Sequence, residues 1–340
     1  FHSPSQRKLM ELRMLNEVWN RMVLEQANYR TVRILYPRVH SHFARAAAWK
    51  TKSLREPLHV PKDTFKIVKA KTRWFIRVPV LDGKKVWLPF KVRDDRLLEG
   101  VEFCDSKIVE RDGRFFMHLV VKRDVAQNDA YSSVLGVDLG ERFTATAVLL
   151  SGACKASPKF YGRNIRGIRR KYAYMRKKLG ERKLLRQIRR MKNKEQRAVN
   201  DQLHKISRSI VSDAHANNAA IILGDLKGIR GRARGRRFNR IVSNMPYSML
   251  TQYISYKASW AGVPIITMSE AHTSRTCHFC HLEGKRISQG RFVCSSCGHE
   301  YNADYNGAFN LAARFLGHSL KNGAYGFRPE SQPFLTELAS

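Results

Sequence analysis

Apolar residues follow a helical spacing through the first fifty residues of the chain. The stretch from residue 5 to about 50 is rich in Leu, Met, Ala, Glu and Arg, and Leu9, Leu12, Leu15 and Trp19 recur three or four positions apart. That spacing places them on one face of a helix. The pattern predicts two or three helices within residues 1–50.

The pattern changes to β-branched and aromatic residues from about 57 to 130. The runs "TRWFIRVPV", "VWLPFKV" and "ERDGRFFMHLVVKR" have the composition of short strands. Asp82-Gly83 and Asp112-Gly113 lie between such runs and have the turn chemistry of hairpins. We expect residues 51–130 to form a small β-barrel.

Strand and helix patterns alternate after residue 130. A buried strand, "VLGVDLG", is followed by the alternating strand "FTATAVLL" and a long helical stretch from 163 to about 217. A strand at 219–226, a helix near "YSMLTQYISYKASWAG" and the strand "VPIITMSE" come next. This order predicts an α/β layer built on a mixed sheet.

The charge of the chain points to a polyanionic partner. Lys and Arg number 63 against 28 Asp and Glu, a net charge of +35, while 43% hydrophobic residues indicate a globular chain. Such a surface binds nucleic acid through counterion release. A membrane surface is the weaker alternative, since the chain contains no run of about eighteen apolar residues and opens with no secretory signal. The chain begins at Phe1, and we expect it to be a fragment.

Basic residues are concentrated in the helical stretch and in the later run "KGIRGRARGRRFNR", residues 227–240. A charge run is often only a solvated helix face. Here the excess is almost all of one sign, which favours phosphate binding.

Four cysteines near the C-terminal end have the spacing of a metal site. Two C-x2-C pairs are separated by thirteen residues and comprise Cys277, Cys280, Cys294 and Cys297. Four thiolates fill a tetrahedral shell, which is typical of structural zinc. Free thiols or two disulfides are the alternatives. We expect Cys104 and Cys154 to be ordinary thiols.

Asp138 stands at the inner end of the buried strand "GVD". Metal-dependent phosphodiester hydrolysis requires several acidic oxygens around two divalent ions, and this position suits such a ligand. An aspartate at a strand end also often caps a turn, so Asp138 alone is weak evidence.

Five motifs together resemble one nuclease family. "GVDLG", "LHKIS", "TSRTCHFC", "CSSCG" and "ADYNGAFNLAAR" occur in this chain in the order seen in TnpB, the OrfB-type RNA-guided nuclease of insertion sequences. The chain is also similar to the Fanzor proteins and type V CRISPR effectors. The resemblance covers residues 131–316, whereas the N-terminal part is similar only in layout.

The resemblance implies six segments. These are a helical recognition-like segment (1–50), a β-barrel wedge-like domain (51–130), an RNase H-like RuvC nuclease core (131–270), a zinc ribbon (271–300), the last acidic helix (301–316) and a C-terminal tail (317–340). The first family aspartate maps onto Asp138. The last maps onto Asp304, followed by Asn306, Ala308 and Asn310.

The middle family acid is replaced, because the usual Glu-Asp-Leu reads Gly224-Asp225-Leu226. The chain is a dead nuclease, or Asp225 substitutes, or another strand supplies the acid. A one-residue shift aims Asp225 at the opposite face. Glu270 ends a strand that we expect beside the one ending at Gly224, at about 4.8 Å, and Fanzor proteins show a similar rearrangement. We favour Glu270.

The resemblance therefore implies an RNA-guided DNA endonuclease associated with an insertion-sequence element. Asp138, Glu270 and Asp304 would hold two Mg²⁺ ions, with guide RNA and target DNA as partners and no membrane association. We expect a cytoplasmic, nucleoid-associated protein, or a nuclear one in a eukaryote. The leading alternative is a nuclease-dead RNA-guided DNA-binding regulator, and a second is a zinc-ribbon DNA-binding protein without a guide.

Overall fold

The computed structural model describes eleven segments of the chain. They are residues 5–25, 28–48, 57–92, 94–111, 113–128, 130–151, 158–191, 193–225, 246–270, 273–288 and 290–322, with side chains to 317. The predicted basic loop at 227–240, Cys154 and residues 323–340 of the predicted tail lie outside them. The chain divides into two compact units, Phe1–Asp124 and Val125–Ser340.

The first unit begins with the helices that the apolar spacing predicted. These are α1 (Gln6–Glu25), α2 (Tyr29–Leu35) and α3 (Ser41–Ala48). The buried positions of α1 are Leu12, Leu15, Trp19, Met22 and Val23, which confirms the helical stripe. This stripe and Phe43 of α3 form one core with the strands that follow.

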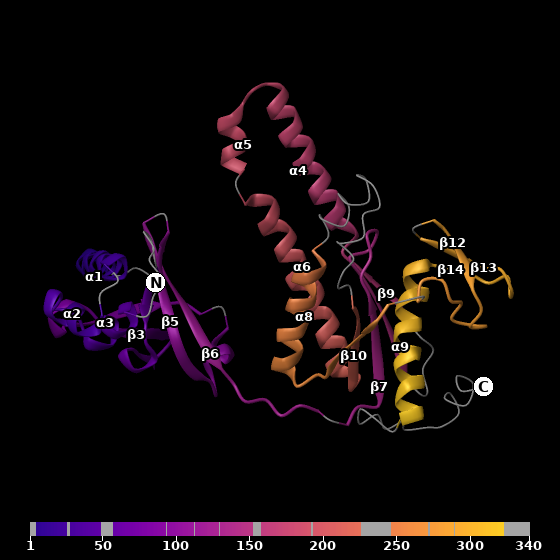
Figure 1. The fold of residues 1–340 in the computed structure, drawn as a ribbon, viewed down its shortest axis with the longest axis horizontal. Helices are drawn as coiled ribbons and strands as arrows, with labels where there is room; N and C mark the ends of the chain where they lie inside the picture. The colour runs from indigo at the N-terminus through magenta and orange to yellow at the C-terminus, as the bar shows by residue number, and fades with distance from the viewer. Residues whose placement is uncertain are drawn as a thin grey trace. The chain divides into compact units, whose positions relative to one another are not determined.

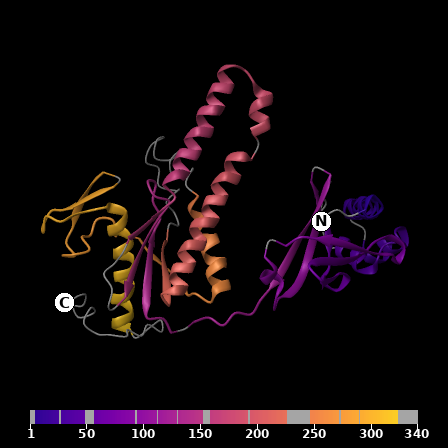
Figure 2. The same cartoon turned by 180° about the vertical axis from the view of Figure 1, so that it is seen from behind.

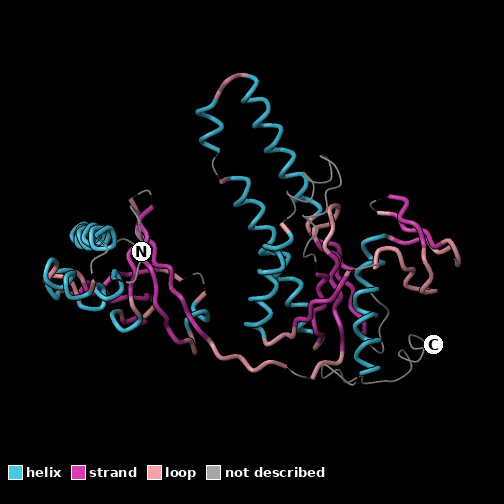
Figure 3. Tube along the Cα trace, viewed as in Figure 1, coloured by secondary structure: helices cyan, strands magenta, loops and turns pink. Residues whose placement is uncertain are grey.

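The strands of the first unit form two antiparallel sheets. One contains β1 (Leu58–Val60), β5 (Glu102–Arg111) and β6 (Arg114–Lys122), and the other contains β2 (Lys66–Ala70), β3 (Arg73–Pro79) and β4 (Lys85–Phe90). Short 3-10 turns lie at Lys62–Thr64, Leu81–Gly83 and Asp95–Leu98. Both predicted hairpins are present, as β3–β4 and β5–β6. The predicted barrel is not confirmed, because the described strands form these two separate sheets. Figure 3 draws the strands in magenta.

The second unit contains the predicted mixed sheet. Its strands are β7 (Ser133–Asp138), β8 (Ala145–Ser151), β9 (Pro158–Tyr161), β10 (Ala219–Asp225) and β11 (Ile265–Ser269), in the order β11-β10-β7-β8-β9. β10 pairs in parallel with both β7 and β11, while β8 and β9 are antiparallel. The carboxyl ends of β7, β10 and β11 therefore lie on the same edge.

Helices cover both faces of this sheet (Figures 1 and 2). The apolar sides of α6 (Lys194–Ala216) and α8 (Tyr247–Ala261) pack on one face, and α9 (Ala303–Asn322) packs on the other. α9 continues past residue 316, where the sequence predicted the last acidic helix to end.

Two elements extend from this layered core. α4 (Arg163–Glu181) and α5 (Leu185–Met191) form a hairpin that projects beyond the sheet (Figure 1). The antiparallel strands β12 (Gly284–Ser288), β13 (Arg291–Cys294) and β14 (Glu300–Tyr301) form the ribbon that contains the cysteines and leads into α9. Within the described segments, no helix is both long and apolar enough to span a membrane.

Candidate active site and zinc site

The three candidate acids come together at one edge of the sheet. Asp138 is the last residue of β7, and Glu270 directly follows β11. Asp304 lies in the first turn of α9. Both Glu270 and Asp304 add to the electrostatic field that raises the pKa of Asp138, so all three carboxyl groups share one local environment.

Glu270 occupies the space of the side chain that Gly224 lacks. β10 and β11 are adjacent and parallel, with Gly224 opposite Met268, as the sequence predicted. A Cβ atom built on Gly224 would overlap Oε1, Cγ and Cδ of Glu270. A side chain at residue 224 and the observed position of Glu270 are therefore mutually exclusive.

The backbone at the end of β11 is held from two sides. Thr273 donates hydrogen bonds from its backbone N–H and its hydroxyl to the Glu270 carbonyl, at 3.2 and 2.9 Å. Arg314 of α9 donates to the Ser269 carbonyl at 2.7 Å. These bonds fix the position from which the Glu270 side chain reaches toward Gly224.

Small residues allow α9 to approach β7 closely. A Cβ on Gly136 of β7 would overlap the carbonyl oxygen of Ala308, and a Cβ on Gly307 would lie 3.2 Å from Oδ2 of Asp138. Asn302 caps the helix, accepting a hydrogen bond from the N–H of Asp304 at 2.9 Å. The close approach brings Asp304 over the end of β7.

Burial raises the pKa of each of the three carboxyl groups. For Asp138 the cause is burial followed by the charges of Glu270 and Asp304. Burial, with a contribution from Asp225, raises the pKa of Glu270 to about 7. For Asp304, burial raises the pKa although Arg286 opposes it. The positive charge near these carboxyl groups is too small to offset the effect of burial on the pKa values of Asp138 and Asp304.

Two of the carboxyl oxygens are also buried without a hydrogen-bond partner, namely Oε1 of Glu270 and Oδ2 of Asp304. An unpaired buried acceptor is costly, and a hard cation bound by oxygen ligands would satisfy it. The donor set therefore fits Mg²⁺. The three acids are not among the described groups whose ligand atoms all lie within 4.8 Å of one another, so they do not converge on one point.

Arg286 and Arg142 approach the acids, and sequence reasoning did not find them. Arg286 of β12 forms an ion pair with Asp304, with Nη2 at 2.8 Å from Oδ1. The charge of Arg142 also lowers the pKa of Asp304, and its guanidinium lies against Gly290 of the ribbon hairpin. Arg286 has no sequence signal, because the ribbon reaches the acids only through the tertiary fold, whereas Arg142 stands four residues after Asp138 in the chain.

Two further acids, Asp225 and Glu300, are more exposed than the three buried acids. Asp225 is exposed at the end of β10. Glu300 lies in β14, where it is half-exposed and pairs with Arg291 at 2.6 Å. Glu300 is therefore a residue of the ribbon surface.

The four cysteine sulfurs form a compact cluster. Their sulfur atoms all lie within 4.8 Å of one another, with Cys277 to Cys297 at 3.7 Å and Cys280 to Cys294 at 3.4 Å. Thiolates around one tetrahedral zinc ion lie about 3.8 Å apart, whereas a disulfide requires about 2.05 Å. The cluster is compatible with zinc, and the disulfide alternative is wrong.

Backbone amides favour the thiolate form of Cys294, one of the four cysteines. N–H groups of Cys297 and Ser296 lower the pKa of Cys294 to about 6. The described histidines of the ribbon are not members of the four-ligand group, although His299 Nδ1 lies 3.3 Å from the Cys297 sulfur. His278 instead packs its ring against Tyr301, Tyr305 and Phe309.

The asparagines after Asp304 attach the ribbon entry to α9. Asn306 accepts a hydrogen bond from the His278 N–H at 3.0 Å and donates to the Thr276 carbonyl at 2.7 Å. Asn310, one turn later, donates to the carbonyls of Thr273 and Thr276. The spacing of Asp304, Asn306 and Asn310 along α9 thus serves two purposes. Asp304 lies beside the other two acids, while the asparagines hold the ribbon.

The second unit combines a mixed α/β sheet that has buried acids at one edge with a four-cysteine ribbon that follows the sheet. Known proteins share parts of this arrangement. A family model described as the TNB domain of Cas12f1-like proteins matches residues 247–311. TnpB-like protein MJ0751 of Methanocaldococcus jannaschii is 32% identical over 120 residues, which is 35% of this chain and 43% of that protein.

The similarity extends to CRISPR effectors. The CRISPR-associated endodeoxyribonuclease Cas12f1 of Sulfoacidibacillus thermotolerans is 29% identical over 242 residues, 64% of this chain and 55% of that protein. The chain thus spans about half the length of these curated relatives. A cryo-EM structure of a Cas12f1–sgRNA–target DNA complex shares the fold, with a TM-score of 0.59 and 15% identity over 92% of this chain and 83% of that one. The predicted resemblance to TnpB and the type V effectors is confirmed.

Proposed function

We propose that this protein is an RNA-guided DNA endonuclease associated with an insertion-sequence element. The observation that carries the proposal is the Glu270 carboxyl group in the space above Gly224, in the shared environment of Asp138 and Asp304. The acid missing from β10 is thereby replaced from β11. The similarity to an endodeoxyribonuclease and to TnpB-like proteins supports this proposal.

In this proposal the core at 131–270 is an RNase H-like RuvC domain. Asp138, Glu270 and Asp304 would hold two Mg²⁺ ions through oxygens that include the unpaired Oε1 of Glu270 and Oδ2 of Asp304. When bound, such ions activate water and stabilise the leaving oxygen in phosphodiester hydrolysis.

The neighbouring side chains balance the charge of Asp304 and fix the position of the ribbon. The 2.8 Å ion pair with Arg286 opposes the rise in the pKa of Asp304 that burial causes, and the partly exposed guanidinium of Arg286 has the geometry to bind a DNA phosphate. Asn306 and Asn310 hold the ribbon on α9, which keeps Arg286 beside Asp304.

The nucleic-acid partners are a guide RNA and a matched target DNA. Base pairing would supply sequence specificity, while the basic chain binds the heteroduplex through its backbone. The net charge of +35 supports this, as does the fold shared with a protein solved in complex with sgRNA and target DNA. The first unit would hold the guide scaffold and read a short flanking DNA motif.

The test is a Mg²⁺-dependent cleavage assay with guide and matched target. We expect the wild type to cleave and Glu270→Gln to lose cleavage while still binding the target. Glu300→Gln is the matched control, because Glu300 is a ribbon acid paired with Arg291. An active Glu270→Gln enzyme would remove Glu270 from the site.

Two variants at Gly224 test the rearrangement itself. Gly224→Ala should abolish cleavage, because the new Cβ overlaps the Glu270 carboxyl group. The double variant Gly224→Glu with Glu270→Gly returns the acid to β10 and should recover part of the activity. A wild type that binds guide and target without cleaving would instead establish the nuclease-dead regulator.

A further inference from the structure

The helical arm, defined here as residues 163–197, has little core of its own. α4 contributes one buried residue, Ile165, and α5 contributes Met191. Large apolar side chains are exposed on it, with Tyr174 62% and Leu185 61% accessible. An exposed apolar surface of this kind is typical of a binding site.

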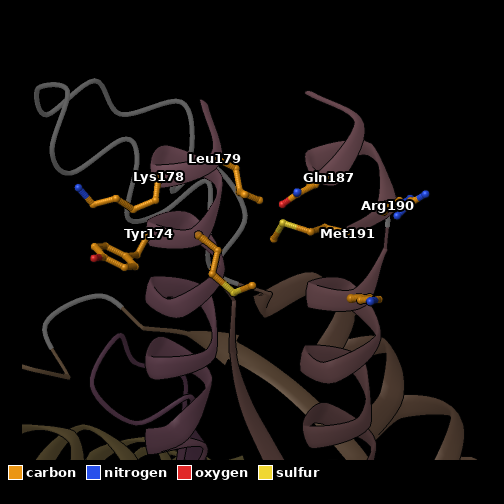
Figure 4. Close-up of a pocket in the computed structure, with 8 residues that line it drawn as sticks. Tyr174, Lys178, Leu179, Gln187, Arg190 and Met191 are labelled. Carbon is orange, nitrogen blue, oxygen red and sulfur yellow. The ribbon is translucent and has the colours of Figure 1, made fainter. Parts of the chain in front are cut away.

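A cleft of about 340 Å³ lies between the helices of the arm, at the lower end of the range for small-ligand sites, about 300–1,000 Å³. Its lining is Tyr174, Met175, Lys178, Leu179, Gln187, Arg190, Met191 and Lys194. Leu179, Gln187 and Met191 point toward one another across the gap (Figure 4). Tyr174 and Lys178 project from the other side of α4, and Arg190 from the far side of α5.

The chemistry of the cleft suits a flat aromatic ring attached to an anion. Thioethers such as those of Met175 and Met191 make favourable contacts with aromatic rings. The Gln187 amide offers both a donor and an acceptor to a base edge. Lys194 belongs to the lining, and Lys178 and Arg190 add positive charge on the outer sides of the two helices.

The charge of the whole arm selects nucleic acid over a protein partner. Residues 163–197 contain 16 Lys and Arg against 2 Asp and Glu. Such a surface attracts a phosphate backbone and repels an equally basic second copy of this chain.

We propose that the arm cleft binds one unpaired nucleotide of the guide RNA, with its base between Leu179 and Met191 and its phosphates on the basic surface of the arm. The inference rests on the proposed function. RNA is the preferred occupant, because the exposed apolar residues are best shielded from water by a partner that stays bound. In the proposed function the guide RNA stays bound, whereas target DNA binds transiently.

The first experiment maps contacts in the full chain. The RNA that copurifies with the protein is transcribed with 4-thiouridine, bound and irradiated, and cross-linked peptides are identified by mass spectrometry. We expect cross-links within residues 174–179 or 187–191. Cross-links confined to other regions would overturn the proposal, as would equal cross-linking of the cleft by single-stranded DNA of the same sequence carrying 4-thiothymidine.

The second experiment compares two matched variants on the arm. Gln187→Glu places a negative charge in the cleft, and Gln196→Glu makes the same change at an exposed arm position outside the lining. One lost base contact is worth about a tenfold change in affinity, so we expect Gln187→Glu to weaken RNA binding about tenfold more than Gln196→Glu. Equal affinities would contradict the proposal.

Failure of the cleft proposal can be distinguished from failure of the endonuclease proposal. A protein that cross-links RNA in the cleft but does not cleave DNA would retain the cleft and lose the endonuclease. A protein that cleaves with its guide but shows no cleft contact would do the reverse. Absence of any bound RNA would overturn both.

Discussion

The two candidate metal sites of the second unit differ in how they are built. The cysteine site comes from one stretch of 21 residues, Cys277 to Cys297, and its sulfurs already lie within 4.8 Å of one another. The carboxylate site draws Asp138, Glu270 and Asp304 from three separate elements. The four cysteines are soft ligands that would fill the coordination shell of one ion. The three acids do not converge on one point, and burial raises the pKa of each.

This difference predicts separate consequences for loss of each site. As ligands of a zinc ion the four cysteines would hold the ribbon together, so their loss should change the structure. Burial raises the pKa of all three acids, and two of their oxygens have no hydrogen-bond partner, so their loss should affect chemistry while the fold stays intact.

The largest expected effect is loss of the zinc site. Structural zinc contributes roughly 10–16 kcal/mol of apparent binding free energy in small zinc domains. Cys294→Ser should therefore remove zinc from the protein and expose the ribbon to proteolysis between residues 275 and 300. Zinc content by mass spectrometry and limited proteolysis provide the measurements. Cys104→Ser, in the first unit, should retain one zinc ion per chain, and a zinc-loaded Cys294→Ser protein would contradict the assignment.

The next effect is loss of an acid. Asp138→Asn should lower the cleavage rate by more than about a hundredfold, since outer-shell partners alone cost about 10- to 100-fold. Its zinc content and melting temperature should match those of the wild type. Single-turnover cleavage with guide and target measures the loss, and an Asp138→Asn protein that cleaves normally would remove Asp138 from the site.

A smaller effect is expected where the two sites meet. Asn306→Ala removes the hydrogen bonds to the His278 N–H and the Thr276 carbonyl, and leaving buried polar groups unpaired costs about 1–3 kcal/mol. The free energy of unfolding from denaturant titration should fall by that amount. Zinc should be retained, because Asn306 is not a ligand. Unchanged stability would show that the asparagine clamp is dispensable.

The smallest predicted effect is on pH dependence. The Glu270 pKa is raised from 4.5 to about 7, so without metal its contribution to stability is present below about pH 4.5 and is lost as pH rises through about 7. Mg²⁺ needs the ionised form, so its apparent affinity should rise about tenfold between pH 6 and 8. Thermal shift against Mg²⁺ concentration measures both trends. Glu270→Gln should flatten the increase, and an affinity independent of pH in the wild type would contradict it.

The amino-acid sequence determined those features whose causes are local. Apolar spacing predicted α1 to α3, strand composition and turn residues predicted both hairpins, and the order of elements predicted the mixed sheet. The cysteine spacing alone predicted a four-thiolate cluster, because each C-x2-C turn brings two sulfurs together within a few residues.

Only the tertiary structure decided the contacts between distant segments. The strands of the first unit form two sheets, since strand composition does not specify which strands close a barrel. The parallel pairing of β10 with β11 put the Glu270 carboxyl group over Gly224. The docking of the ribbon on α9 brought Arg286 to Asp304. Such contacts depend on packing between elements far apart in the chain. Local patterns of residues do not record them, and the adjacency of β10 and β11 was expected only from the resemblance to the nuclease family.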